Sequence, residues 1–449
     1  MSRIYLLKYS VKGIKNLNDW AELFFYNKTI KKNFSIQKYN VKGVYGTNGA
    51  GKSGIVRSVQ ILRNLILDPY YLNNIYVQKL LNDVVNKKTK TLSMKADFLH
   101  QSNESMLVYH YEIIIEKNHL DIFDISSEKL CYKKATAAKE SLIEIYHTEG
   151  GTLNFLVKDS SSEIIVDLTK NLLSSSTLPS AFLRNEELVR NELINDDIWN
   201  GLTSLIIFAS NLFVCMDKSD EHSSYYLRDY SKSNENSDIT TLKSQANQMI
   251  RLSSWLSSAF QTSPMKIKKD SYHIFEENVK QLYSFLRIFK NDLRGIEIDR
   301  KEDEDSYVCS LVMKYEEYSI NAEFESTGIK KLIRLFDYLN KMVQGNIVFI
   351  DEFDSNLHDV YLCALLEFLM DNAKGQLCFT THNIGPMDIL KKNKKSIDFL
   401  STDHKVYSWK HNGNYSPSSL YKNGMIEGSA FNVFSFDFVS AFNITEDDK

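Results

Sequence analysis

Gly46-Thr47-Asn48-Gly49-Ala50-Gly51-Lys52-Ser53 is a glycine-rich octapeptide that separates two different apolar patterns. It matches GxxxxGK[ST] at every fixed position, which few chains of this length do by chance. Apolar residues precede it at Val41, Val44 and Tyr45. After it, apolar residues recur at steps of four, three and four, at Ile55, Val59, Leu62 and Ile66. The first pattern predicts a strand and the second predicts one face of a helix, with a glycine turn between them.

This octapeptide has the chemistry of a phosphate-binding loop. Glycines allow consecutive backbone N–H groups to turn inward around phosphates at the N-terminus of a helix. Lys52 would reach the β and γ phosphates, and the Ser53 hydroxyl would coordinate Mg²⁺. We therefore expect a site for ATP and Mg²⁺ rather than an ordinary glycine turn. The residues expected to bind the nucleotide here are Gly46, Asn48, Gly49, Gly51, Lys52 and Ser53.

A second motif follows Gly345, where the apolar residues 347–350 end in Asp351 and Glu352. A strand that is covered on both faces of a parallel sheet needs continuous apolarity, and ligands bind at the carboxyl ends of such strands. Asp351 would hold Mg²⁺ directly or through water, and Glu352 would polarise the attacking water. Alone, this pattern is more typical of a strand followed by a solvated acidic turn. Its pairing with the glycine-rich octapeptide favours a nucleotide-hydrolysing site.

Three shorter features accompany these motifs. Ser326 and Gly328 precede an expected helix, whose first N–H groups can bind an anion. Phe353-Asp354-Ser355-Asn356-Leu357-His358 follows the two acids directly. The apolar strand pattern 376–381 leads to His382, whose imidazole could sense a γ-phosphate. Each feature alone is more typical of a helix cap, a turn or a core histidine. Their order along the chain and the intervals between them favour a functional site.

Together these motifs resemble those of ABC-type ATPase heads, and within them the SMC-like and RecF-like branch that includes OLD-family and abortive-infection ATPases of bacterial phage defence. The octapeptide resembles the Walker A motif, Glu325-Ser326-Thr327-Gly328-Ile329-Lys330-Lys331 the signature, and residues 347–352 the Walker B motif. Residues 353–358 resemble the D-loop, and Thr380-Thr381-His382-Asn383 resembles the loop that carries the switch histidine. The resemblance covers residues from about 40 to 67 and from about 320 to 385.

The resemblance implies how the site residues would act. In that family two heads close face to face, and each ATP lies between the Walker motifs of one subunit and the signature of the other. Ser326 and Gly328 would then contact ATP across the interface of a homodimer. The resemblance does not exclude a higher oligomer. The expected catalytic residues are Lys52, Glu352 and His382, and the expected Mg²⁺ ligands are Ser53 and Asp351.

The implied fold class is α/β: an ABC-type P-loop ATPase head with an antiparallel β arm and a helical insertion. Strand patterns between Met94 and Leu168 predict the arm, and mainly helical patterns from Asn171 to Leu293 predict the insertion. We expect residues 1–168 and 296–449 to form the split head and residues 169–295 to form a helical lid. No heptad pattern is sustained over several turns, so a long coiled coil is not expected.

Composition and charge restrict the remaining classes. The 449 residues are 43% hydrophobic and 25% charged, unlike those of disordered, collagen-like or disulfide-scaffold chains. No apolar run approaches the ~20 residues of a membrane span, and the N-terminus lacks a secretory signal, so we expect a cytoplasmic protein with no membrane contact. A net charge of −3 disfavours a generally basic nucleic-acid binder. It does not exclude nucleic-acid binding through a local basic strip, Lys391, Lys392, Lys394 and Lys395, although such a strip is more typical of a solvated face.

We predict an ATPase that dimerises on ATP and acts as sensor or regulator of a separate effector in bacterial phage defence. The signature lacks the Leu-Ser-Gly-Gly-Gln form of transporters. The stretch after His382 is shorter than the TOPRIM nuclease domain that OLD nucleases carry, so a nuclease would be a separate protein. The alternative is a RecF-like DNA-repair clamp ATPase, which would engage duplex or gapped DNA on binding ATP.

Overall fold

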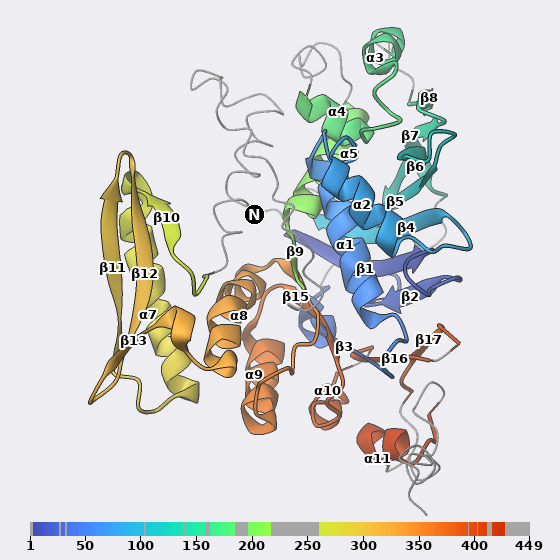
Figure 1. Ribbon diagram of the computed structural model, residues 1–449. Coiled ribbons are helices and arrows are strands. Elements are labelled where there is room, and N and C mark those ends of the chain that lie inside the picture. The colour runs from blue at the N-terminus through green and yellow to red at the C-terminus, as the bar shows by residue number, and fades with distance from the viewer. Residues whose placement is uncertain are drawn as a thin grey trace, which may run out of the picture.

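The fold combines three β-sheets with helices that pack between and around them (Figure 1). We describe it from a computed structural model. The residues described are 3–26, 28–31, 34–102, 105–137, 141–157, 162–184, 196–216, 260–393, 395–401, 403–410 and 415–426. Lys394 of the expected basic strip lies outside these ranges.

The six-stranded sheet has the order β17-β16-β3-β15-β14-β9 and is parallel except for the β16–β17 pair. Its strands are β3 (Val41–Gly46), β9 (Leu212–Cys215), β14 (Ile347–Ile350), β15 (Gln376–Thr381), β16 (Ile397–Leu400) and β17 (Val406–Ser408). Every residue of β3, β14, β15 and β16 is buried, as the mainly apolar sequences of these strands require. The octapeptide and the acid pair therefore follow two interior strands of the same sheet.

The seven-stranded sheet is antiparallel and has the order β2-β1-β4-β5-β6-β7-β8. Its strands are β1 (Arg3–Lys12), β2 (Ala21–Phe24), β4 (Thr91–Gln101), β5 (Met106–Lys117), β6 (Phe123–Lys134), β7 (Ile143–Glu149) and β8 (Thr152–Leu156). The antiparallel strands expected between Met94 and Leu168 are thus present, followed by α3 (Ser162–Thr169). They do not form a separate arm, because β4 pairs with β1 and the sheet shares its core with the helix after the octapeptide.

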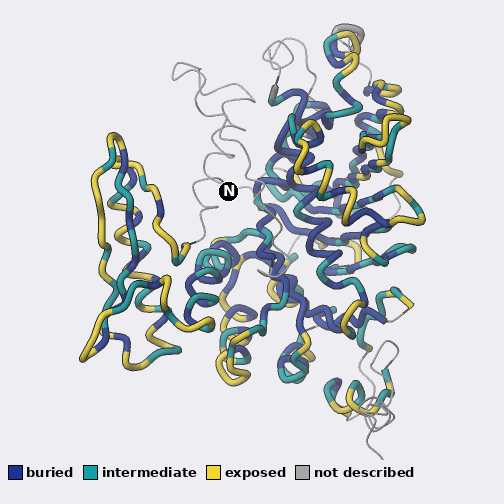
Figure 2. The backbone as a smooth tube through the Cα atoms, viewed as in Figure 1, coloured by how far each residue is buried: buried dark blue, intermediate teal, exposed yellow. Residues whose placement is uncertain are grey.

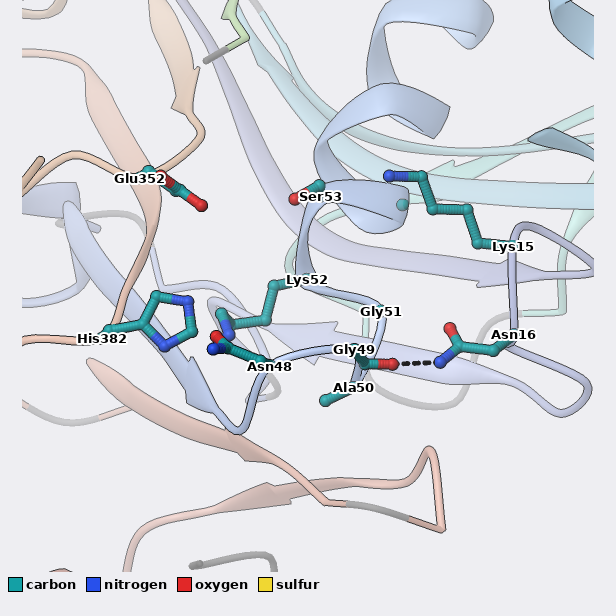
Figure 3. Close-up of a pocket in the computed structure, with 11 residues that line it drawn as sticks. Lys15, Asn16, Asn48, Gly49, Ala50, Gly51, Lys52, Ser53, Glu352 and His382 are labelled. Carbon is teal, nitrogen blue, oxygen red and sulfur yellow. Dashed lines mark hydrogen bonds between the residues drawn. The ribbon is translucent and has the colours of Figure 1, made fainter. Parts of the chain in front are cut away.

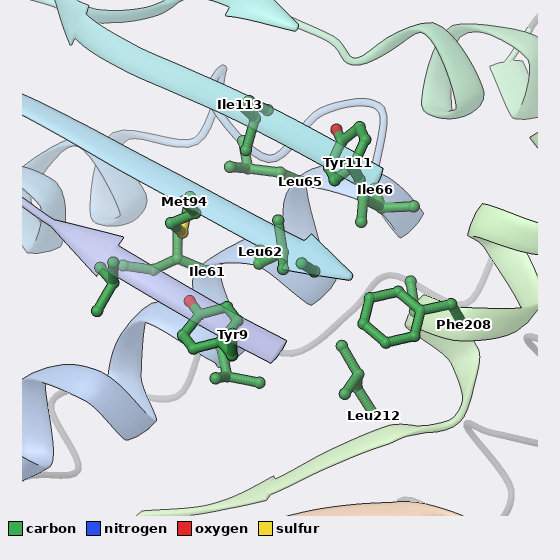
Figure 4. Packing of buried hydrophobic residues seen from close by; sticks show 14 of the residues in the cluster. Tyr9, Ile61, Leu62, Leu65, Ile66, Met94, Tyr111, Ile113, Phe208 and Leu212 are labelled. Atoms are coloured by element: carbon green, nitrogen blue, oxygen red, sulfur yellow. The ribbon is translucent and has the colours of Figure 1, made fainter. Parts of the chain in front are cut away.

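That helix, α1 (Lys52–Leu67), lies in the largest hydrophobic core, between the two sheets. Nearly all of its residues are buried, so its packing surface is wider than the single apolar face seen in the sequence. The helices α4 (Leu178–Arg184) and α5 (Asp196–Ser210) contact α1 on another side. Figure 2 shows buried residues throughout this part of the molecule. Figure 4 shows Ile61, Leu62, Leu65 and Ile66 of α1 beside Tyr9, Met94, Tyr111, Ile113 and Phe208.

A second core covers the opposite face of the six-stranded sheet, beneath α8 (Thr327–Gln344), α9 (Asp359–Asn372) and α10 (Met387–Leu390). A third core lies where α7 (Tyr272–Phe289) and the first half of α8 pack on the four-stranded sheet at the left of Figure 1. The strands of that sheet are β10 (Met265–Lys268), β11 (Gly295–Asp303), β12 (Ser306–Lys314) and β13 (Ser319–Asn321). The structure also contains the helices α2 (Ile75–Val84) and α11 (Pro417–Lys422).

The range 169–295, for which we expected a helical lid, contains more than helices. Its described part includes α4, α5 and α7, but also β9, which pairs in parallel with β14. Because α5 packs on α1 and β9 extends the central sheet, residues 196–216 belong to the core beside the octapeptide. Residues 217–259 of this range lie outside the described residues.

Among the described helices, none combines the length and the apolarity that crossing a membrane requires.

A buried ion pair stabilises the six-stranded sheet just upstream of the octapeptide. Lys42 on β3 and Asp398 on β16 have side chains that are 1% and 0% exposed, and their Nζ and Oδ2 atoms are 2.6 Å apart. The Ser408 hydroxyl donates to the other oxygen of Asp398 at 2.6 Å, and Lys42 also donates to the Lys395 carbonyl. Both charges are therefore compensated by partners on neighbouring parts of the sheet.

Replacing Lys42 by methionine should lower the free energy of unfolding by about 3–5 kcal/mol, because the Asp398 carboxylate would be buried without its cation. Chemical denaturation of the wild type and Lys42→Met measures this difference. The matched control is Lys392→Met, which removes an exposed pair with Glu367 and should cost less than about 1 kcal/mol. Equal losses in the two variants would contradict the stabilising role of the buried pair.

Candidate nucleotide-binding site

A cavity of about 400 Å³ lies at the N-terminus of α1, within the size range of small-molecule sites (Figure 3). It is lined by Lys15, Asn16, Asn48, Gly49, Ala50, Gly51, Lys52, Ser53, Gly54, Glu352 and His382. These residues come from the turn after β1, from the octapeptide and the first turn of α1, and from the segments that directly follow β14 and β15. Most of the residues expected from the sequence to bind or hydrolyse ATP therefore lie around one cavity.

At two positions of the octapeptide only glycine fits the backbone and its neighbours. Gly51 has a φ of +114°, and a Cβ there would lie 2.8 Å from the Leu17 side chain and 2.9 Å from that of Asn16. At Gly46 a Cβ would lie 2.4 Å from the Leu400 carbonyl oxygen on the adjacent strand. The loop can therefore pass close to β16 and to the β1–β2 turn only because both positions lack a side chain.

Lys52 begins α1 and is 6% exposed. Its Nζ donates to the backbone carbonyls of Gly46 at 2.7 Å and Thr47 at 3.1 Å. Burial lowers the pKa of Lys52 to about 8, against the opposing effect of the carboxylates of Asp351, Glu352 and Asp354. A buried ammonium with neutral hydrogen-bond partners is a strong attractor for an anion such as a phosphate.

Asp351 follows β14 and is 1% exposed. Its Oδ1 accepts a 2.5 Å hydrogen bond from the Thr380 hydroxyl on β15, whereas its Oδ2 has no hydrogen-bond partner. A buried carboxylate oxygen without a partner is costly unless a cation or a water satisfies it. Asp351 and Ser53 therefore fit the oxygen ligands that Mg²⁺ prefers. In the described part of the chain, this site included, no cluster of three or more His, Cys, Asp or Glu residues is placed to hold a metal ion.

Glu352 has an unusual backbone conformation, with a φ of +48°. Its backbone N–H donates to the Thr380 hydroxyl at 2.8 Å, and its carbonyl accepts from Lys331 Nζ at 2.9 Å. Glutamate rarely adopts this conformation, so neighbouring groups must hold it. The residue lines the cavity on the side opposite Lys15 (Figure 3).

His382 lies directly after β15 and lines the same cavity as Lys52 and Glu352. Burial lowers the pKa of its imidazole, and the positive charge of Lys52 lowers it further. The neutral ring, which can both donate and accept a hydrogen bond, is therefore the favoured form near neutral pH.

Ser326 and Gly328 do not line this cavity. Ser326 caps α8, and its hydroxyl accepts from the Ile329 N–H at 3.4 Å. Gly328 approaches the turn after Glu352, because a Cβ there would lie 2.9 Å from the Asn356 carbonyl oxygen. The structure thus places the signature-like residues beside the D-loop-like stretch and outside the phosphate loop of the same chain.

Two residues of the cavity lining escaped the sequence reasoning. Lys15 and Asn16 belong to the turn between β1 and β2, and the Asn16 side chain donates to the Gly49 carbonyl. No motif marks these two positions, since each depends on two segments meeting in the folded chain. Lys331 lies in the signature-like stretch, but its contact with the Glu352 turn was not predicted from the sequence. The positive φ of +48° at Lys15 is likewise visible only in the structure.

No protein-family model and no curated protein matches this sequence. Two of the solved structures found to be similar are an Smc head bound to the C-terminal winged-helix domain of ScpA and the recombination mediator protein RecF with ATPrS. The first is 13% identical, with a TM-score of 0.43, and the match covers 90% of this chain and 98% of that one. The second is 11% identical, with a TM-score of 0.38, and the match covers 91% of this chain and 99% of that one.

Nucleotide affinity should decrease as the pH rises above about 8. In the free protein Lys52, with its pKa lowered to about 8, loses its proton over this range, whereas a bound triphosphate favours the charged ammonium. The affinity should fall by at most about tenfold per pH unit, and binding should be accompanied by proton uptake. Calorimetric titration with a non-hydrolysable ATP analogue in buffers of different ionisation enthalpy measures both quantities. A constant affinity from about pH 7 to 9.5 would contradict this role of Lys52.

Replacing Lys52 by alanine should abolish nucleotide binding or turnover, because the charge opposite the β and γ phosphates is removed. Equilibrium binding of a fluorescent ATP analogue, followed by a phosphate-release assay, gives the comparison. Lys374→Ala, at an exposed lysine away from the cavity lining, is the control and should behave as the wild type. Wild-type binding and turnover in Lys52→Ala would remove the assignment of the phosphate loop.

Proposed function

We propose that this protein is an ABC-type ATPase that binds ATP with Mg²⁺ and hydrolyses it to ADP and phosphate. The observation that carries the proposal is the cavity at the start of α1. It combines a glycine loop, a buried lysine and, from two other strands, Glu352 and His382. A phosphate-binding loop without a nearby acid would support binding alone. The acid and the histidine at the same cavity supply groups for hydrolysis.

Each side chain has a defined task in this proposal. Lys52 and the loop N–H groups bind the β and γ phosphates, and Glu352 orients and deprotonates the attacking water. His382, with its lowered pKa, donates a hydrogen bond to the γ-phosphate from a neutral imidazole. Mg²⁺, held by Ser53 and Asp351, would neutralise phosphate charge.

We further propose that the active form is a dimer closed by ATP. Ser326 and Gly328 lie at the exposed start of α8, away from the phosphate loop of their own chain. In the family that the motifs resemble, the corresponding residues bind the ATP that is held by a second subunit. The position of the α8 start supports this arrangement, because Ser326 and Gly328 do not line the cavity of their own chain.

The biological role that we propose is regulation of a separate effector protein in bacterial phage defence, with a RecF-like DNA-repair clamp as the alternative. Its support is the resemblance of the motifs to OLD-family and abortive-infection ATPases. Within the expected basic strip, Lys391 and Lys392 have the acidic partners Asp388 and Glu367 at 3.4 and 2.6 Å. Their charges are therefore partly neutralised, which favours a protein partner over the DNA backbone at this strip.

Glu352→Gln should bind ATP but hydrolyse it about 10²–10⁴-fold more slowly, the usual contribution of a positioned general base. Because ATP then persists, the dimer should accumulate. Phosphate release and size-exclusion chromatography with light scattering, each with and without ATP, measure the two effects. Glu367→Gln, at a surface acid paired with Lys392, is the control. Elution of Glu352→Gln that does not change with ATP would contradict the ATP-closed dimer.

The two roles differ in what the ATP-bound Glu352→Gln protein should bind. A defence regulator should capture a protein encoded beside it and bind 40-base-pair duplex or gapped DNA no better with ATP than without it. A repair clamp should bind that DNA only with ATP, and more weakly as the salt concentration rises. Fluorescence anisotropy with labelled DNA decides between them, and ATP-dependent DNA binding would replace the defence proposal by the alternative.

A further inference from the structure

We propose that Lys331 is a positioning residue, which holds the Glu352 turn in the conformation needed for hydrolysis and connects this turn to the start of α8. The inference rests on the proposed ATPase function. It assigns a role to a residue outside the phosphate loop and the acid pair, and it begins from the hydrogen bonds that one lysine makes across the fold.

Lys331 lies on the first turns of α8, three residues after Gly328. Its Nζ donates to the Glu352 carbonyl at 2.9 Å and to the Ser355 hydroxyl at 2.6 Å. The Ser355 N–H also donates to the Glu352 carbonyl, at 3.1 Å. One ammonium group therefore closes both ends of the turn that follows β14.

This turn needs such support because its backbone is not relaxed. Glu352 and Asn356 have φ values of +48° and +61°, in the region that non-glycine residues rarely occupy. The Thr380 hydroxyl holds the turn from the β15 side, through the Glu352 N–H at 2.8 Å. Lys331 holds the other side of the same residue, through its carbonyl. Glu352 is thus held between β15 and α8, and removal of either contact should let its carboxylate move.

The position of α8 gives this contact a second consequence. Ile329, Leu332 and Ile333 in its first half pack in the core of the four-stranded sheet, whereas Leu335 and Leu339 pack against the six-stranded sheet. The helix therefore bridges two cores. A shift of its first half relative to the six-stranded sheet would change the Lys331 contacts directly. In this way, whatever binds at the α8 start, beside Ser326, can alter the placement of Glu352.

The test compares Lys331→Met with Lys330→Met, a change of the same size at the adjacent position of the same helix. Lys331→Met should lower kcat by about 10- to 100-fold, the usual effect of misplacing a catalytic group, while KM and the affinity for a non-hydrolysable ATP analogue stay within about twofold. Lys330→Met should keep the wild-type kcat. Lys331→Arg, whose guanidinium can donate to both acceptors, should recover at least part of the loss.

A double-mutant cycle on kcat with Ser355→Ala separates positioning from a general weakening of α8. The effects of Lys331→Met and Ser355→Ala should be strongly non-additive, because both remove the same contact, whereas Lys330→Met and Ser355→Ala should be additive. If Lys331→Met does not fold, Ser355→Ala still decides, because loss of the hydroxyl that accepts from Lys331 should lower kcat below the wild-type value. A wild-type kcat in Ser355→Ala would then refute the positioning role.

Two results would overturn the proposal, and they are distinguishable. Equal kcat values in Lys331→Met and Lys330→Met, with the wild type active, would refute the positioning role alone. No ATP hydrolysis by the wild-type protein under any condition would refute the proposed function and, with it, the reaction that Lys331 is inferred to serve.

Discussion

The carboxyl ends of β3, β14 and β15 meet at one edge of the parallel sheet, and the whole candidate site depends on that alignment. β15 pairs with β3 on one side and with β14 on the other, with Thr381 opposite Tyr45 and Phe379 opposite Ile350. Neighbouring strands lie about 5 Å apart, so groups that follow all three strands come within reach of one small ligand. A slip of one residue in either pairing would turn these side chains to the other face of the sheet.

Burial of charge is the second constraint on this edge. Lys42 and Lys52 stand at the two ends of β3 and its loop, and both are almost fully buried, yet their surroundings differ. Lys42 has a carboxylate partner, Asp398, at 2.6 Å, and the pair stabilises the sheet. Lys52 has two backbone carbonyls instead, and its burial lowers its pKa to about 8. An ammonium that lacks a carboxylate in direct contact gains most from an added anion, so Lys42 is a structural lysine and Lys52 is the candidate for binding an anionic ligand.

Predictions from the sequence succeeded where the signal was local. The loop, its helix and the apolar strand before Asp351 were all identified, because residue spacing and glycine positions report directly on backbone geometry. They failed where packing between distant segments decided the outcome. The strands between Met94 and Leu168 were identified, but their union with β1 in one sheet over α1 was not. β9 was missed within a helical stretch, since four residues are too few to show a strand pattern beside a long apolar helix.

The sequence by itself predicted a phosphate-binding loop between a strand and a helix, and it grouped Asp351, Glu352 and His382 with that loop, because each stands at the end of its own local pattern. The tertiary structure decided which groups support them. Asn16 reaches Gly49 across the β1–β2 turn, Thr380 joins Asp351 to Glu352, and Lys331 closes the Glu352 turn from α8. These contacts connect segments that are far apart along the chain or on different strands. No local spacing encodes them, because they arise only when strand register and helix packing bring the side chains together.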